Sequence, residues 1–275
     1  MSTIIRTRSP FFIRTPQQTS SSLSYFQINI TVFGGLSSST EICDDLYATY
    51  SLQKKPLGAE NSVSFDISEI VNDHIEQIFT GTYASAKSSI WVTVATSARQ
   101  SDGTIIGSVT TNTYLAQEGF NKFKEGANYT TEPIAMLSST YIQNHKGSTI
   151  TIPVNAERVT SVQWRNGTSV RETDTFTDNG NQNQKIQFAL FTAGTFLDNA
   201  LITYDSGSTT TITLEQVEEC KYPVNKITFV NRWGALQDLF FFKKSTESLD
   251  ATRENFNRSI FEARSVQLDP PEEVG

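Results

Sequence analysis

Histidine is the side chain best suited to acid–base and metal chemistry near neutral pH, and this chain has two, His74 and His145. Asp73 and Glu76 stand near the first, and a Lys-Gly pair follows the second. Neither has a second histidine, a cysteine or a carboxylate at the spacing of a metal-binding motif. This pattern is typical of solvated surface residues, so we expect no metal site and no cofactor.

Motifs for nucleophilic or phosphate chemistry are missing from the sequence, which has no Gly-x-Ser-x-Gly elbow, P-loop or dinucleotide-binding fingerprint. Carboxylate pairs that hydrolyse sugars follow no fixed spacing, because the two groups come from distant parts of a chain. We therefore predict no catalytic residue and a protein that is not an enzyme. The carboxylates available for such a pair are Asp44, Asp45, Glu69, Asp174 and Asp178, and no pattern selects two of them.

Aromatic side chains are the more informative set, with 18 Phe, 9 Tyr and 3 Trp. Aromatic rings on a protein surface stack on sugars or anchor a partner protein. Trp91 faces away from its neighbours Ile90 and Val92, and two roles stay open for it: packing in the core or between domains, or contact with a glycan. Trp164 shares a strand face with Val162 and is predicted to be a core residue.

The run Leu239-Phe240-Phe241-Phe242 places large apolar side chains on both faces of one strand. Such a strand must be covered on both sides, by its own sandwich and by another domain or subunit. We read this run as a sign of an interface. The subunit contacts predicted here are Trp233, Phe240 and Phe242.

The dominant pattern of the chain is an alternation of apolar and polar residues, which is typical of half-buried β-strands. In the first half, Asp102-Gly103 is a favoured tight-turn pair between two such segments. The strands predicted there cover residues 26–32, 46–52, 63–67, 90–94 and 105–109.

One helix is expected to interrupt these strands. Asp66 can cap its first turn, with Glu69 as the capping-box partner three residues on. The apolar residues that follow fall on one helical face: Ile70, Val71, Ile75, Ile78 and Phe79.

The second half of the chain predicts seven or eight short strands. Asn166-Gly167 between two apolar segments indicates a tight hairpin, and Asp178-Asn179-Gly180 marks another turn. Short strands separated by turns are typical of an antiparallel sandwich of the immunoglobulin or fibronectin type III kind. The strands cover residues 148–154, 159–164, 186–191, 201–204, 209–214, 226–230 and 236–242.

These elements predict a mainly β chain with two antiparallel β-sandwich domains, one short helix and extended terminal arms. Residues 1–22 lack periodicity and read as an extended arm. The first sandwich is expected over 23–130 and the second over 131–247. A C-terminal strap with an acidic tail is expected over 248–275, where Asp269, Glu272 and Glu273 close the sequence.

Composition narrows the classes of function. The net charge of −7 argues against a nucleic-acid binder or an anionic-membrane binder. No stretch reaches the ~20 apolar residues that span a bilayer, and the N-terminus does not resemble a signal peptide. Cys43 and Cys220 can pair or stay as buried thiols, and both alternatives remain open.

Two segments resemble parts of virion structural proteins of tailed bacteriophages: Arg6-Thr7-Arg8-Ser9-Pro10-Phe11-Phe12-Ile13 and Phe229-Val230-Asn231-Arg232-Trp233-Gly234-Ala235-Leu236-Gln237-Asp238. The resemblance implies a tail, neck or fibre-attachment protein with repeated β-sandwich domains. It carries over no catalytic residue. The implied location is the virion, after synthesis in the host cytoplasm.

Residues and resemblance together predict a non-enzymatic structural component of a phage virion that assembles with copies of itself and with other virion proteins. The arm, with Arg6, Arg8, Phe11, Phe12 and Arg14, is expected to lie across a neighbouring subunit. Deleting residues 1–20 is then expected to leave a folded monomer that no longer assembles.

Two rival functions use the same scaffold. A carbohydrate-binding adhesin or receptor-binding module would present solvent-facing aromatics, with Trp91 as the expected contact to a host surface glycan. A polysaccharide depolymerase would hold two close carboxylates in a cleft.

Overall fold

The computed structural model describes residues 3–34, 46–57, 61–77, 79–83, 89–121, 135–178, 185–192, 197–217 and 221–243. The chain divides into two units, residues 1–243 and residues 244–275. Every described residue belongs to the first unit. Several predicted features lie outside the described residues: Cys43, Cys220, Ile78 of the predicted helix face, Asn179-Gly180 of the predicted turn, and the C-terminal strap with its acidic tail.

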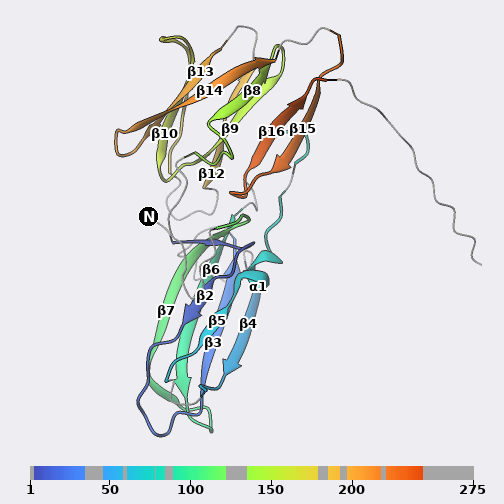
Figure 1. Ribbon diagram of the computed structural model, residues 1–275. Coiled ribbons are helices and arrows are strands. Elements are labelled where there is room, and N and C mark those ends of the chain that lie inside the picture. The colour runs from blue at the N-terminus through green and yellow to red at the C-terminus, as the bar shows by residue number, and fades with distance from the viewer. Residues whose placement is uncertain are drawn as a thin grey trace, which may run out of the picture. The chain divides into compact units, whose positions relative to one another are not determined.

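A five-stranded sheet forms the larger layer of the first sandwich-like group (Figure 1). Its strand order is β1-β7-β6-β3-β4, and each pairing is antiparallel except that of β1 with β7, which is parallel. Alternate residues of β3 and β6 point into one core because apolar and polar side chains alternate along both strands. The strands are β1 (Ile4–Arg6), β3 (Tyr25–Phe33), β4 (Leu46–Lys54), β6 (Ser89–Arg99) and β7 (Ile105–Gln117).

The smaller layer of this group includes the N-terminal segment, which the sequence predicted to be a free arm. Here β2 (Phe12–Arg14) pairs with β5 (Ser64–Asp66). Phe11 and Ile13 are buried in the same cluster as the inward residues of β3 and β6, and Ile5 joins them from β1. The expectation of an extended N-terminal arm is therefore wrong, because its apolar side chains fill the core of their own sandwich.

The predicted helix is much shorter than its apolar face suggested. Helix α1 covers only Ser68–Asn72, and Ile67 occupies the N-cap without a side-chain hydrogen bond. Asp66 instead accepts hydrogen bonds from the backbone N–H and hydroxyl of Ser68, at 3.0 and 2.7 Å. Asp66 thus fixes the turn into the helix, but no capping box forms with Glu69.

The second sandwich-like group has a five-stranded sheet of order β11-β10-β13-β14-β8, in which only β14 and β8 are parallel. A two-stranded sheet, β12-β9, packs on it around the fully buried Trp164. The predicted Asn166-Gly167 turn joins β10 to β11. The strands are β8 (Tyr141–His145), β9 (Thr149–Asn155), β10 (Val159–Asn166), β11 (Ser169–Thr175), β12 (Ile186–Thr192), β13 (Asn199–Tyr204) and β14 (Thr209–Val217).

A separate antiparallel hairpin completes the described chain. It consists of β15 (Asn225–Val230) and β16 (Leu236–Phe241), which lie side by side in Figure 1. The ring of Phe240 lies 6.1 Å from that of His145 on β8, and its backbone N–H donates to the side-chain oxygen of Gln143 at 2.8 Å. These contacts fix one face of the hairpin on the second sandwich.

The prediction of a mainly β chain with two sandwich-like domains and a single short helix is confirmed. The sequence did not predict three strands, β1, β2 and β8, and it indicated β11 only as the second strand of the Asn166-Gly167 hairpin. The exact domain boundaries predicted from the sequence stay predictions.

Candidate interaction surface

The β15–β16 hairpin has one largely exposed face and one face that packs against the rest of the chain. Cross-strand pairing sets Ile227 against Leu239 and Asn225 against Phe241, so these residues share one face with Phe229. The intervening residues of both strands form the other face. We call the first the outer face, defined by Ile227, Phe229, Leu239 and Phe241.

The outer face is apolar and accessible. Its four side chains are 38–51% exposed, although each is large and hydrophobic. Scattered exposed apolar residues are normal on a protein surface, but four on one face of two paired strands make a contiguous patch. The predicted interface run at 239–242 falls here: Phe240 is buried against the chain's own sandwich, while Leu239 and Phe241 remain exposed.

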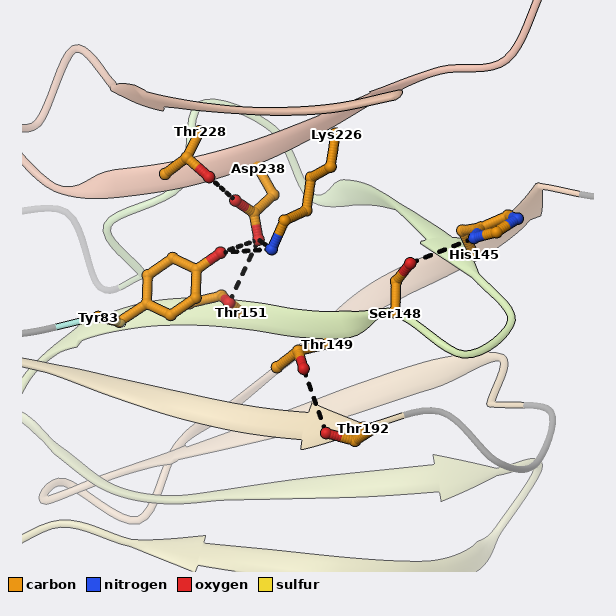
Figure 2. A network of polar contacts seen from close by, with 9 residues as sticks. All are labelled: Tyr83, His145, Ser148, Thr149, Thr151, Thr192, Lys226, Thr228 and Asp238. Atoms are coloured by element: carbon orange, nitrogen blue, oxygen red, sulfur yellow. Dashed lines mark hydrogen bonds and ion pairs between the residues drawn. The ribbon is translucent and has the colours of Figure 1, made fainter. Parts of the chain in front are cut away.

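The inner face carries the buried apolar residues Leu236 and Phe240 and, between them, Asp238, whose side chain is only 4% exposed (Figure 2). Thr228 donates a hydrogen bond to one carboxylate oxygen at 2.7 Å. The other oxygen accepts from Thr151 of β9 at 3.3 Å and from the hydroxyl of Tyr83, a residue of the segment between α1 and β6. A buried carboxylate with this many donors anchors the hairpin to the second sandwich and to the segment that carries Tyr83.

Lys226 adds the matching positive charge to this network. Its ammonium lies 3.5 Å from Asp238 and donates to the Tyr83 hydroxyl at 3.1 Å. Burial lowers the pKa of Lys226, but the bond to Tyr83 and the charge of Asp238 outweigh it, so the pKa lies above its usual value. The stabilisation from this pair is complete below the pKa of an unfolded-state lysine and is lost as the pH rises through the higher folded-state pKa.

Replacing Asp238 by asparagine should lower the free energy of unfolding by about 2–3 kcal/mol, because the charged acceptor of several donors is lost in a buried position. The measurement is the urea midpoint followed by intrinsic fluorescence. Asp205→Asn removes the same charge from an exposed turn and should shift stability by less than about 0.5 kcal/mol. Equal shifts for the two variants would contradict a supporting role for Asp238.

The turn between β15 and β16 contacts the N-terminal segment directly. Arg6 donates to the side chain of Gln117 at 2.9 Å and lies with its guanidinium carbon 5.9 Å from the Trp233 ring centre. It also donates to the backbone oxygen of Trp233. The indole N–H of Trp233 in turn donates to Leu137 at 3.0 Å. This turn is therefore a joint between the two sandwiches.

Most of the predicted subunit contacts are used inside the chain itself. Arg6, Phe11 and Phe240 are buried, and Trp233 is partly buried in the joint, so their assignment as subunit contacts is corrected. Arg8 is half exposed and donates to Glu118 through Nε at 2.7 Å. Arg14 is exposed, and Phe12 and Phe242 are partly exposed.

Trp91 is 4% exposed and packs with Ile4, Phe33 and Leu115 on the side of the sheet away from the main core. A side chain buried in this way offers no ring face to a sugar, so the glycan contact expected of Trp91 is wrong. Sequence reasoning missed the residues of the outer face on β15, Ile227 and Phe229. Their i, i+2 spacing on a predicted strand was the available signal.

The two histidines and the candidate carboxylate Asp174 form hydrogen bonds within the chain, and Asp44 and Asp45 lie outside the described residues. His74 hydrogen-bonds the hydroxyl of Tyr50 at 2.8 Å, and His145 bonds Ser148 at 3.2 Å. Asp174 accepts from the indole of Trp164 at 2.8 Å. No group of three or more potential metal-ligating side chains occurs within the described residues.

An open hollow of about 510 Å³ near the helix is lined by three carboxylates, Asp66, Glu69 and Asp73. Asp66 already accepts hydrogen bonds from the backbone N–H of Phe11 at 3.1 Å and from Ser68. Its role is therefore to hold the helix start, and we assign no chemistry to the hollow.

No protein-family model and no curated protein matches the chain. Among solved structures, the periplasmic chaperone SfaE is 11% identical, with 78% of this chain and 97% of that chain covered and a TM-score of 0.24. The calcium-binding domain CBD12 of CALX1.1 is 9% identical, covering 73% and 74%, with a TM-score of 0.23. Alpha-2-macroglobulin of E. coli is 10% identical, covering 88% of this chain but 15% of that chain, with a TM-score of 0.25. Scores this low define neither a shared family nor a shared activity.

Helices long and apolar enough to cross a membrane do not occur in the described ranges.

Proposed function

We propose that the chain is a non-enzymatic structural subunit that works by assembling with copies of itself and with other proteins of a tailed-phage virion. The observation that carries the proposal is the outer face of the β15–β16 hairpin, an exposed apolar surface held rigidly by the buried Asp238 network beneath it. Monomeric proteins rarely leave such a face in water unless it binds something.

The two segments that resemble virion proteins support the choice of particle. The first segment forms the end of β1 and most of β2, and the second forms the end of β15, the turn and the start of β16. They meet in the fold through Arg6 and Trp233. The segments that carry the resemblance therefore belong to one structural unit, which positions the outer face. A place in the tail, neck or fibre-attachment region fits such a subunit.

The adhesin hypothesis gains no comparable support, because Trp91 lies in the core.

The purified full chain should form oligomers whose average mass rises with protein concentration, because burying the outer face removes apolar surface from water. Sedimentation velocity from low to high micromolar concentration is the measurement. A strictly monomeric protein throughout that range, alone and in extracts of infected cells, would overturn the assembly function.

A further inference from the structure

The outer edge of β15 carries backbone groups that face away from its neighbour. In the described chain β15 pairs with β16 alone. At the turn, the N–H of Asn231 donates to Ala235 at 2.8 Å, so the backbone of Asn231 points toward β16. Because antiparallel strands alternate inward and outward, Lys226, Thr228 and Val230 direct their N–H and C=O groups outward.

This edge lacks the devices that normally keep edge strands apart. Natural edges carry outward lysines, prolines or bulges. The one charged side chain of β15, Lys226, is engaged with Asp238 on the inner face. By contrast, the edge strand β11 of the second sandwich exposes Arg171 and Glu172. The outward N–H and C=O groups of β15 can therefore pair with a further strand.

We propose that β15 pairs antiparallel with β15 of a second copy, about a two-fold axis at Thr228, so that the two hairpins form one four-stranded sheet. This inference rests on the proposed assembly function and names the surface and register that it uses.

The register follows from the outward groups. With the axis at Thr228, that residue faces Thr228 of the partner subunit, and Lys226 faces Val230 of the partner subunit. All outward N–H and C=O groups of β15 then pair. Ile227 faces Phe229 of the partner subunit at a position between hydrogen-bonded pairs, where opposing Cα atoms approach to about 4.5 Å. No two like charges stand opposite each other.

The area available predicts a weak contact between two isolated copies. Half-exposed side chains of this size leave on the order of 100 Å² each in water, since a buried aromatic covers about 150–250 Å². In a side-by-side sheet only Ile227 and Phe229 of each copy meet across the new edge, so these four side chains would bury at most on the order of 400 Å², below the roughly 1,200 Å² of a stable interface. Association is expected in the micromolar range or weaker, and stronger where an assembly holds copies close together.

Charge variants of the full chain test both the surface and the register. Ile227→Lys with Phe229→Lys sets two positive charges against two in the partner subunit and should abolish the concentration-dependent rise in mass. Ile227→Lys with Phe229→Glu sets each lysine against a glutamate and should restore association at low salt. Val170→Lys, an exposed apolar position on β11, is the matched control and should associate as the wild type does.

Hydrogen exchange gives a second readout. The outward amides of Lys226, Thr228 and Val230 should become protected as the wild-type concentration rises, while those of β11 should not change. Circular dichroism confirms that each variant is folded. The inference is overturned if the double-lysine variant keeps the wild-type mass, or if the lysine–glutamate variant stays monomeric. If the double-lysine variant keeps the wild-type mass, oligomers form through another surface and the proposed function stands. If the wild-type protein never associates, both the proposed function and the β15 pairing are wrong.

Discussion

Replacing Gly234 by alanine should lower the free energy of unfolding by about 4 kcal/mol or more, which is exceptional for the addition of one methyl group. Gly234 has a φ of +77°, a region that side chains rarely adopt, and a Cβ there would fall on the carbonyl oxygen of Glu118. That oxygen belongs to the backbone, so the clash is relieved only if the turn moves away from residues 118–119. The thermal midpoint and the urea midpoint measure the loss.

A matched control separates backbone strain from close approach. Gly207 has nearly the same φ, +79°, but nothing lies within 4 Å of the position a Cβ would take. Gly207→Ala should therefore cost only the strain of the left-handed conformation, about 1–2 kcal/mol. If the two alanine variants are equally unstable, the approach of Gly234 to Glu118 contributes nothing, and the joint is looser than the structure indicates.

The joint at Gly234 matters for assembly because it fixes where the hairpin points. Gln77 donates to the backbone oxygen of Gly234 at 3.1 Å, and the N–H of Phe120 donates to Arg232 at 2.7 Å. Both donors come from the first sandwich. An outer face carried on a joint that contacts both sandwiches has one orientation, so that repeated copies can pair with the same geometry.

The sequence predicted the strands whose alternation is long enough to read. Seven alternating residues in β3, 26–32, and the Asn166-Gly167 turn gave correct elements, because a half-buried strand imposes a period of two and a tight hairpin needs a particular turn residue. The run at 239–242 likewise indicated a strand with one face outside its own sandwich. Leu239 and Phe241 are exposed as that reasoning requires.

The N-terminal segment could not be read in this way. Strands β1 and β2 have three residues each, too few to show a period. Ile4 pairs with Leu115, which is more than a hundred residues away in the sequence. Parallel strands are not joined by a tight turn, so no turn motif predicts this pairing. For Trp91, alternation showed which face it occupies but not that Ile4 covers that face.

Deleting residues 1–20 should unfold the first sandwich, in place of the folded monomer expected of a free arm. The deletion removes four side chains that are almost completely buried: Ile4, Ile5, Phe11 and Ile13. At about 1.5–3 kcal/mol for each buried side chain, the loss is about 6–12 kcal/mol. That is comparable with the whole stability of a typical domain, about 5–15 kcal/mol. Hydrogen exchange over residues 23–117 should lose its protection.

Point variants make the same test without removing the segment. Phe11→Ala empties a core position against the ring of Tyr114, 5.5 Å away, and should cost about 3–5 kcal/mol. Arg14→Ala changes an exposed residue in the adjoining strand and should cost less than about 0.5 kcal/mol. A truncated protein that melts like the wild type but no longer associates would restore the arm hypothesis. If the truncated protein instead loses cooperative melting, and Phe11→Ala is destabilised to a smaller extent, these residues are a structural layer of the sandwich. The joint at Trp233 depends on that layer.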